Sequence, residues 1–191
     1  MKKLLTIILT LSSTICLSSY ADESSEYNDW YYELNINYLS GFSDLTDAYE
    51  SEGYTIDFEI PIGLSFSIGK EFAHNWSWDI ELGPMILIAG DTNATIIPIG
   101  AGVRYIFLDS TSLAPYVRAG IQNAFVSGDY IENGGLGYNA AVGLIFSPDK
   151  AVSWGIEAKY DNTEIEFEHG GGWYVEDIEP YGLVISAFLS F

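Results

Sequence analysis

A short acidic stretch late in the chain holds residue types that can bind a metal ion. Glu166, Glu168 and His169 offer carboxylate oxygens and an imidazole nitrogen, which are common metal ligands. Their spacing is unremarkable for a metal site, and together with Glu164 it is more typical of a solvated acidic loop. Gly170–Gly172 follow directly, but they lack the lysine and the helix of a phosphate-binding loop. We therefore expect a hairpin turn here, with no metal site and no cofactor.

A second group of charged residues occupies alternate positions within segments that are otherwise apolar. These residues share one face with Gly, Ser and Ala, which suits a narrow polar interior. Arg104, Arg118 and Lys159 can pair there with acids, and such pairing would fill and brace the interior. The sequence does not fix which acid pairs with which base. The acids of this face are Glu33, Asp57, Glu59, Asp79, Glu81 and Glu157.

Eight segments of about 9 to 15 residues show this alternation and are predicted to be strands. In the clearest of them, Thr55–Gly69, seven apolar residues occupy every second position. A membrane-spanning strand needs about 9–11 residues, whereas strands of soluble proteins are usually about 5–6. The other segments are Trp30–Tyr38, Trp76–Ile88, Ile96–Phe107, Pro115–Phe125, Gly137–Phe146, Val152–Tyr160 and Tyr181–Phe191.

The connections between these segments give an independent signal. The first, fifth and seventh are long, whereas the second, fourth and sixth are short, as in barrels with short periplasmic turns and longer outer loops. Aromatic residues gather near both ends of the segments, as in the girdles of transmembrane barrels. The sequence therefore predicts an all-β fold, an eight-stranded antiparallel up-and-down transmembrane β-barrel with its apolar face toward lipid. The alternative is a soluble, secreted lipocalin-like binder, whose apolar face points inward.

The bulk composition agrees with an exported protein that does not bind nucleic acid. Residues 1–21 combine a basic start, an apolar stretch and Ser19-Tyr20-Ala21, which predicts a signal peptide. Residues 22–29 then form a short periplasmic segment, and residues 30–191 form the barrel. Removal of the signal peptide leaves five basic residues against 27 acidic ones and no cysteine. Nucleic acid is thus an unsuitable partner, because phosphate binding needs clusters of basic residues.

Several stretches resemble small Gram-negative outer-membrane β-barrels of the OmpA/OmpX/opacity type. The resemblance covers residues 30–191, and it implies a monomer in the cell outer membrane, in contact with its lipid and lipopolysaccharide. Its motifs are pattern-level, so they indicate the architecture better than the activity. The stretches are IGKEFAHNWSWDIELG (Ile68–Gly83), IPIGAGVRYIF (Ile97–Phe107), APYVRAGI (Ala114–Ile121), GYNAAVGLIF (Gly137–Phe146) and GIEAKY (Gly155–Tyr160).

The last segment, YGLVISAFLSF, resembles the C-terminal strand that the outer-membrane assembly machinery reads in this family. Members of the family usually end on Phe, as this sequence does. Pairing of the last strand with the first would also close the barrel, because an open edge in lipid leaves backbone groups without hydrogen bonds. The residues expected on the lipid face of this assembly signal are Tyr181, Leu183, Ile185, Ala187, Leu189 and Phe191.

The resemblance also raises lipid A-modifying enzymes as an alternative function. A lipid A deacylase of this kind would carry a His-x-Ser-Asn stretch, but His74 precedes Asn75-Trp76 and His169 precedes three glycines. A palmitoyl transferase would need an N-terminal amphipathic helix, for which residues 22–29 are too short and too acidic. We therefore expect no enzyme, and instead a structural or surface-interaction role such as adhesion or binding.

The long connections are acidic and contain no Lys or Arg, so they predict a negative outer surface. Such a surface would attract basic partners or divalent cations, with Mg²⁺ or Ca²⁺ bridging carboxylates to the phosphates of lipopolysaccharide. Alternatively, the acids only keep the loops soluble. The acids concerned are Asp44, Asp47, Glu50, Glu52, Asp91, Asp129, Glu132, Asp161, Glu164, Glu166, Glu168, Glu176 and Asp177.

Overall fold

A computed structural model describes residues 30–55, 62–89, 92–107, 112–148, 150–170 and 174–191 of the chain. The predicted signal peptide and periplasmic segment lie outside the described residues. So do Asp57, Glu59 and Asp91, three of the acids singled out above. Among the residues that are described, no helix is long and apolar enough to cross a membrane.

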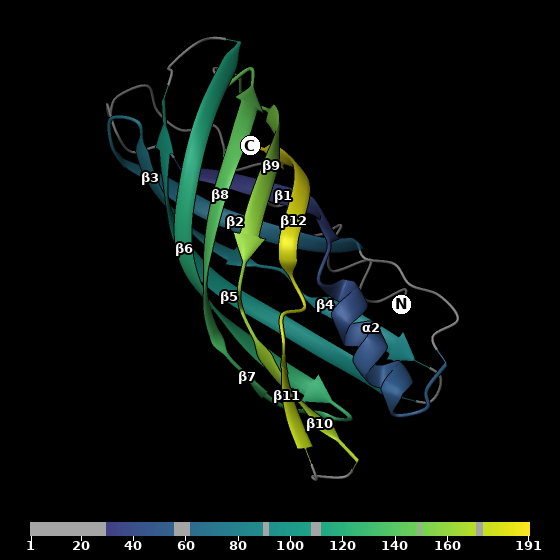
Figure 1. Cartoon of the computed structure of the whole chain (residues 1–191). Coiled ribbons are helices and arrows are strands. Elements are labelled where there is room, and N and C mark those ends of the chain that lie inside the picture. Colours follow the sequence, from purple (N-terminus) through teal and green to yellow (C-terminus); the bar gives the residue numbers. More distant parts are fainter. Residues whose placement is uncertain (1–29, 56–61, 90–91, 108–111, 149, 171–173) are drawn as a thin grey trace.

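The wall of the molecule is a closed antiparallel sheet (Figure 1). Neighbouring strands follow the order β3-β2-β1-β12-β9-β8-β6-β5-β4, and a further pairing of β3 with β5 closes the sheet into a barrel. The first and last strands pair directly, with Leu34 opposite Leu189, as the closure argument predicted. The strands of the wall are β1 (Trp30–Leu39), β2 (Ile62–Ala73), β3 (Trp76–Leu82), β4 (Met85–Ala89), β5 (Thr92–Ile106), β6 (Leu113–Gly128), β8 (Leu136–Phe146), β9 (Ser153–Asp161) and β12 (Gly182–Ser190).

The sheet contains nine strands but corresponds to an eight-stranded barrel, because one predicted strand is split into two. The sequence predicted a single strand over Trp76–Ile88, but the structure divides it at Gly83-Pro84. A proline has no backbone N–H to donate to a neighbouring strand, so regular pairing stops there. β3 and β4 both pair with β5, at Leu82 with Ile99 and at Met85 with Ile96. They therefore occupy one strand position of the barrel.

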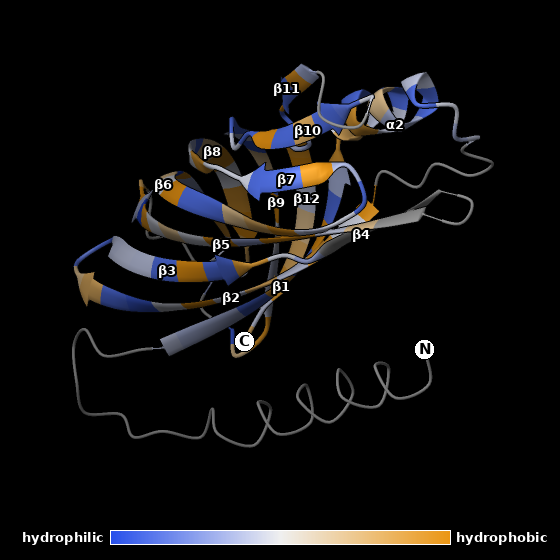
Figure 2. Cartoon of the chain, turned by 90° about the horizontal axis from the view of Figure 1, so that it is seen from below, coloured by the Kyte–Doolittle hydropathy of each residue, from blue (hydrophilic) through white to orange (hydrophobic). Residues whose placement is uncertain are grey.

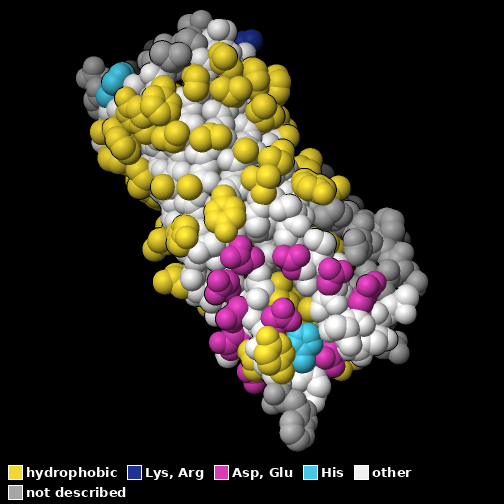
Figure 3. Space-filling view, in the orientation of Figure 1, with side chains coloured by type: hydrophobic (Ala, Val, Ile, Leu, Met, Phe, Trp, Pro, Cys, Tyr) yellow, Lys and Arg dark blue, Asp and Glu magenta, His cyan; other side chains and the backbone are white. Residues whose placement is uncertain are grey.

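The two faces of the wall differ as the alternation predicted. Hydrophilic and hydrophobic residues alternate along the strands (Figure 2). Outward side chains such as Ile36, Ile121 and Val142 are 56–61% exposed, whereas the inward Asp79 and Arg118 are at most 4% exposed. Hydrophobic side chains cover the barrel surface, and acids gather at one end (Figure 3). This arrangement is the one that a barrel in lipid requires.

The acidic end carries a folded cap that the sequence prediction missed. The first long connection contains a helix, α2 (Phe42–Ser51), and the fifth contains β7 (Ile131–Gly134). The seventh forms the expected hairpin, β10 (Ile165–His169) and β11 (Tyr174–Ile178). These strands make a separate three-stranded sheet in the order β11-β10-β7. We call α2 and this sheet the outer cap; both lie at the same end of the barrel (Figure 1).

An apolar core joins the outer cap to the mouth of the barrel. Leu45 and Tyr49 of α2 and Phe167 of β10 are fully buried. The Tyr49 ring meets the Phe167 ring edge-on at 5.0 Å, and its hydroxyl donates to the carbonyl of Asp129 at 2.6 Å. From the wall, Leu39, Ile96, Ala124 and Val184 join the same core. The lumen is therefore closed by apolar packing at its outer end in this structure.

Tyr181 departs from the predicted lipid face. Its side chain is 5% exposed and belongs to the core at the barrel mouth, whereas Leu183 and Ile185 point outward as predicted. The strand begins only at Gly182, whose φ of 57° lies in the left-handed region. A residue in that region breaks the extended geometry on which alternation depends, so Tyr181 does not continue the outward series.

Candidate functional site

The periplasmic half of the lumen is built around Arg104. Its two terminal nitrogens each donate to one oxygen of the Glu33 carboxylate at 2.7 Å. The guanidinium also lies between two aromatic rings, 5.1 Å from the centre of Tyr31 and 4.6 Å from that of Tyr116. Tyr116 fits because Gly143 faces it, and a Cβ there would come within 2.3 Å of the Tyr116 ring. This buried bidentate pair is thus held between two aromatic rings.

A second ion-pair group fills the middle of the lumen. Arg118 Nε donates to both Asp79 oxygens at 3.0 Å, and its Nη1 donates to the Asn139 side-chain oxygen at 3.1 Å. Lys159 Nζ donates to both Glu81 oxygens at 3.1 Å. The terminal Nη2 of Arg118 lies 3.4 Å from Glu81, so the two pairs form one network.

The structure therefore brings together most of the charged residues predicted to face the lumen. The exceptions are Asp57 and Glu59, which lie outside the described residues. Glu157 has no ion pair within the described chain and instead accepts a hydrogen bond from the Tyr116 hydroxyl at 2.8 Å. Desolvating these groups is costly, and each ion pair offsets that cost only because its geometry is close. The network thus fills the middle of the described lumen with paired side chains.

Asp161 belongs to this lumen and not to the exposed acidic surface. The sequence predicted Asp161 to be an acid of the seventh connection, but its side chain is fully buried. The alternation along β9 would have predicted this position, because Glu157, Lys159 and Asp161 occupy every second residue and therefore share one face. Its Oδ1 accepts hydrogen bonds from the backbone N–H and the hydroxyl of Thr163.

The other predicted acids lie on the outer cap. Asp44 and Asp47 on α2, together with Glu164 and Asp177, are exposed. Glu166 is half-buried and accepts a hydrogen bond from the Asn133 side chain of β7 at 2.7 Å. Glu168 is also half-buried. The acidic surface is thus carried largely by regular secondary structure, not by extended loops.

His169 links the two parts of the outer cap. Its Nδ1 lies 2.9 Å from Glu52, just after α2, and its Nε2 lies 2.9 Å from Glu176 of β11. Desolvation disfavours the charged ring, but the hydrogen bonds to Glu176 and Glu52 prevail and raise the pKa of His169. Glu166 and Glu168, which the sequence raised with His169 as conceivable metal ligands, do not join it. No three His, Cys, Asp or Glu residues form a metal-binding group in the described part of the chain.

The predicted assembly signal lies on the seam between β12 and β1. Leu183, Ile185, Ala187 and Leu189 are exposed on the outer face. Phe191 is half-buried and exchanges backbone hydrogen bonds with Tyr32. Tyr181 is the one member that turns inward.

Comparison of the sequence with protein-family models and with curated proteins gives no significant match. The fold, in contrast, is similar to solved outer-membrane barrels. Neisserial surface protein A aligns with a TM-score of 0.56 at 12% identity, over 87% of this chain and 98% of that one. OprG from Pseudomonas aeruginosa gives 0.55 at 11% identity, over 88% and 98%. Outer membrane protein W from E. coli gives 0.50 at 16% identity, over 87% and 99%. The chain thus has the fold of bacterial outer-membrane β-barrels, as the sequence predicted.

Proposed function

We propose that this outer-membrane barrel is not an enzyme and that it binds positively charged partners at the cell surface through its outer cap. The observation that carries the proposal is the combination of a dense acidic surface with a packed core beneath it. Because Tyr49 and Phe167 pack α2 against β10, the backbone positions that carry the carboxylates are set before a partner binds. Such preorganisation lowers the entropy cost of binding. The barrel closes within one chain, which favours a monomer.

A groove between α2 and the β10–β11 hairpin is the best candidate for the contact. It has a volume of about 440 Å³. Asp44, Asp47 and Glu176 supply carboxylates, and Tyr174 supplies an aromatic face. A Lys or Arg side chain suits this lining, because its charged head can meet the carboxylates while its apolar stem lies along the ring. The long connections that form the cap contain no Lys or Arg. His169, which also lines the groove, already contacts Glu176 and Glu52. Asp44 and Asp47 are therefore the carboxylates left for such a partner.

The arrangement around His169 favours binding over catalysis. Ser51 Oγ lies 3.3 Å from His169 Nδ1, so a serine, a histidine and acids are close together as in hydrolases. However, carboxylates contact both ring nitrogens, and this favours an imidazolium that cannot accept a proton from the serine. The Ser51 hydroxyl instead donates to the carbonyl of Ala48 at 2.7 Å. The group therefore suits a clamp between α2 and β11 better than a nucleophile and its base.

Divalent cations remain part of the proposal as weak bridges. Lipopolysaccharide is anionic, so direct contact with the outer cap would be repulsive, and Mg²⁺ or Ca²⁺ would have to join carboxylate to phosphate. In the described cap, no three His, Cys, Asp or Glu residues are arranged to hold a metal ion. Bridging would therefore use single carboxylates and would compete with basic partners for the same acids.

Binding of a fluorescent Lys- and Arg-rich peptide to the purified protein in lipid nanodiscs tests the proposal. We expect binding at low salt that weakens as salt rises. The double variant Asp44→Asn/Asp47→Asn should weaken it about fivefold, since exposed charge pairs contribute up to about 1 kcal/mol each. The matched double Glu132→Gln/Asp177→Asn removes the same charge outside the groove and should weaken it less.

Two results would contradict this function. The first is an unmodified protein that does not bind the peptide at low salt, because the acids would then only keep the cap soluble. The second is an equal loss in both double variants, which would remove the groove from the proposal. Addition of Ca²⁺ tests the role of divalent cations. If Ca²⁺ competes for the same acids, it lowers peptide binding. If Ca²⁺ bridges carboxylates to phosphates, it raises the binding of lipopolysaccharide to the same nanodiscs.

A further inference from the structure

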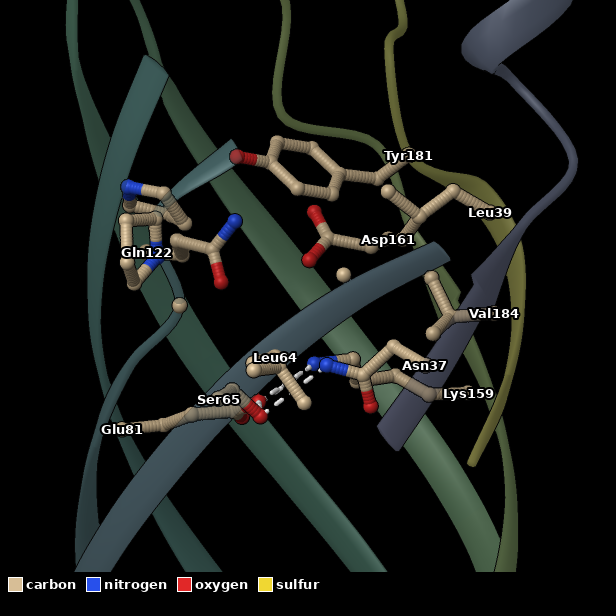
Figure 4. Close-up of a pocket in the computed structure, with 14 residues that line it drawn as sticks. Asn37, Leu39, Leu64, Ser65, Glu81, Gln122, Lys159, Asp161, Tyr181 and Val184 are labelled. Atoms are coloured by element: carbon tan, nitrogen blue, oxygen red, sulfur yellow. Dashed lines mark hydrogen bonds and ion pairs between the residues drawn. The ribbon is translucent and has the colours of Figure 1, made fainter. Parts of the chain in front are cut away.

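A small cavity lies inside the barrel mouth, between the lumen ion pairs and the apolar core of the outer cap. Figure 4 shows Asp161 and Tyr181 reaching into it from the side of β9 and β12, toward Gln122 on the far wall. The Lys159–Glu81 ion pair forms its floor. Its free volume is about 20 Å³, and a single water molecule needs about 10–15 Å³ on that measure. The cavity therefore has room for one guest of about the size of a water molecule.

Two buried polar atoms in this cavity have no hydrogen-bond partner among the described residues. They are Oδ2 of Asp161 and the hydroxyl of Tyr181, whose side chains are 0% and 5% exposed. The other Asp161 oxygen is satisfied by Thr163 at 2.7 and 3.1 Å. Buried polar groups are nearly always hydrogen-bonded, because leaving one unpaired costs about 1–3 kcal/mol. The two unpaired atoms thus point to a ligand that binds in the cavity.

The charge of the lumen identifies the kind of occupant. Apart from Glu71 at the periplasmic rim, five acids face three bases inside the described barrel. Each base forms an ion pair with one acid: Arg104 with Glu33, Arg118 with Asp79, and Lys159 with Glu81. Of the two remaining acids, Glu157 accepts a hydrogen bond from the Tyr116 hydroxyl. Asp161 accepts hydrogen bonds from Thr163 and is attracted by the Lys159 ammonium, which Glu81 already binds. The described lumen thus holds two more acids than bases, and an excess of buried negative charge is strongly disfavoured.

We propose that this cavity is a binding site for one small monovalent cation, Na⁺ or K⁺, held by Asp161 Oδ2 and the Tyr181 oxygen. Such an ion is about as large as a water molecule, so it fits the cavity. It would contact both unpaired oxygens and would add positive charge to a lumen that has more acids than bases. Ca²⁺ and Mg²⁺ carry two positive charges and are usually bound by several carboxylates, whereas this cavity offers one free carboxylate oxygen, so a monovalent ion matches its charge better. A water molecule would satisfy the hydrogen bonds but leave the charge uncompensated.

Thermal unfolding of the full protein in neutral detergent tests the site. The chloride concentration is fixed, and the only cation is Na⁺, K⁺ or the bulky N-methyl-D-glucamine cation. We expect the apparent Tm to be higher by at least about 2 °C in Na⁺ or K⁺. Asp161→Asn should abolish the difference and Tyr181→Phe should reduce it. Asp177→Asn, which neutralises an exposed acid of the outer cap, should keep it.

Sodium-23 line broadening on the unmodified protein provides a second readout if Asp161→Asn does not fold. We expect broadening that K⁺ reverses and that is weaker in Tyr181→Phe. Equal Tm values in all three cations would overturn the proposal and leave water or a proton as the occupant. A cation effect that persists in Asp161→Asn would also overturn it, because the ion would then bind elsewhere.

Discussion

The backbone N–H of Phe191 donates a hydrogen bond to the carbonyl oxygen of Tyr32 at 2.9 Å, and the N–H of Tyr32 donates one to the carbonyl of Phe191 at 3.2 Å. The regular part of β12 ends at Ser190, so this exchange extends the seam with β1 to the final residue of the sequence. Phe191 is therefore a structural part of barrel closure, in addition to any role as an assembly signal.

Removal of Phe191 is expected to impair assembly of the barrel. The deletion removes both hydrogen bonds to Tyr32 and the ring, whereas Phe191→Ala removes only the ring. We expect the deletion to reduce strongly the heat-modifiable protein recovered from outer membranes at modest expression. A comparable loss in Phe191→Ala would assign the effect to the ring. Tyr174→Ala, on the outer cap, is the control, and a normal yield of the deleted protein would contradict the prediction.

The Glu33–Arg104 pair should be worth much more than an exposed pair. Both side chains are buried, so Glu33→Gln leaves a guanidinium without its counter-charge between two aromatic rings. Breaking a buried pair in this way typically costs about 3–5 kcal/mol. We expect a matching drop in unfolding free energy by urea titration in detergent. Replacing both residues, as Glu33→Gln/Arg104→Met, should cost less than the sum of the single changes; additive losses would argue against a coupled pair.

The residues that follow a strict period of two were the ones that the sequence predicted well. Glu33 and Arg118 were assigned to the lumen because they alternate with apolar residues along their segments, and the structure places both there. Their partners were not predictable, because Glu33 meets Arg104 across the lumen from a strand that is not its neighbour. Tyr181 was misplaced because one residue with positive φ, Gly182, ends the period.

The outer cap was missed for a different reason. Phe42, Leu45, Ala48 and Tyr49 have the spacing of a helix face, and all four are buried. The acids among them made the segment look like a solvated loop, although acids on the opposite face are what an amphipathic surface helix requires. The sheet order of the cap could not be predicted, because short strands carry too few residues to show a period.

The core of the outer cap should unfold without opening the barrel. Phe167 is fully buried and contacts the rings of Tyr49 and Tyr130. A Phe→Ala change in a packed core typically lowers the free energy of unfolding by about 3–5 kcal/mol. Phe167→Ala should therefore be enough to unfold the outer cap. We expect faster protease cleavage within α2 and the β10–β11 hairpin, with heat-modifiable migration of the barrel retained. Val175→Ala, at an exposed position of β11, is the matched control. Simultaneous loss of cap and barrel would show that the two form one cooperative unit.

His169 should make the stability of the outer cap depend on pH. Its pKa is raised by the carboxylates of Glu176 and Glu52, although desolvation opposes them. A group whose folded pKa lies above its unfolded value, about 6.5 for histidine, contributes fully below that pH. The contribution is lost as pH rises through the folded pKa, because the imidazolium then deprotonates. Hydrogen exchange of the β10–β11 amides, corrected for intrinsic rates, should therefore show weaker protection at pH 8.5 than at pH 5.5.

The control for this pH effect is His169→Gln, which keeps a polar side chain but no charge that titrates. It should show reduced protection already at acid pH and little change across the same range. Amides of β6, in the barrel wall, should not respond in either protein. Because His169 is partly exposed, we expect salt to reduce the effect as well, since screening weakens both contacts. Protection that increases with pH, or the same profile in His169→Gln, would show that His169 does not join α2 to β11.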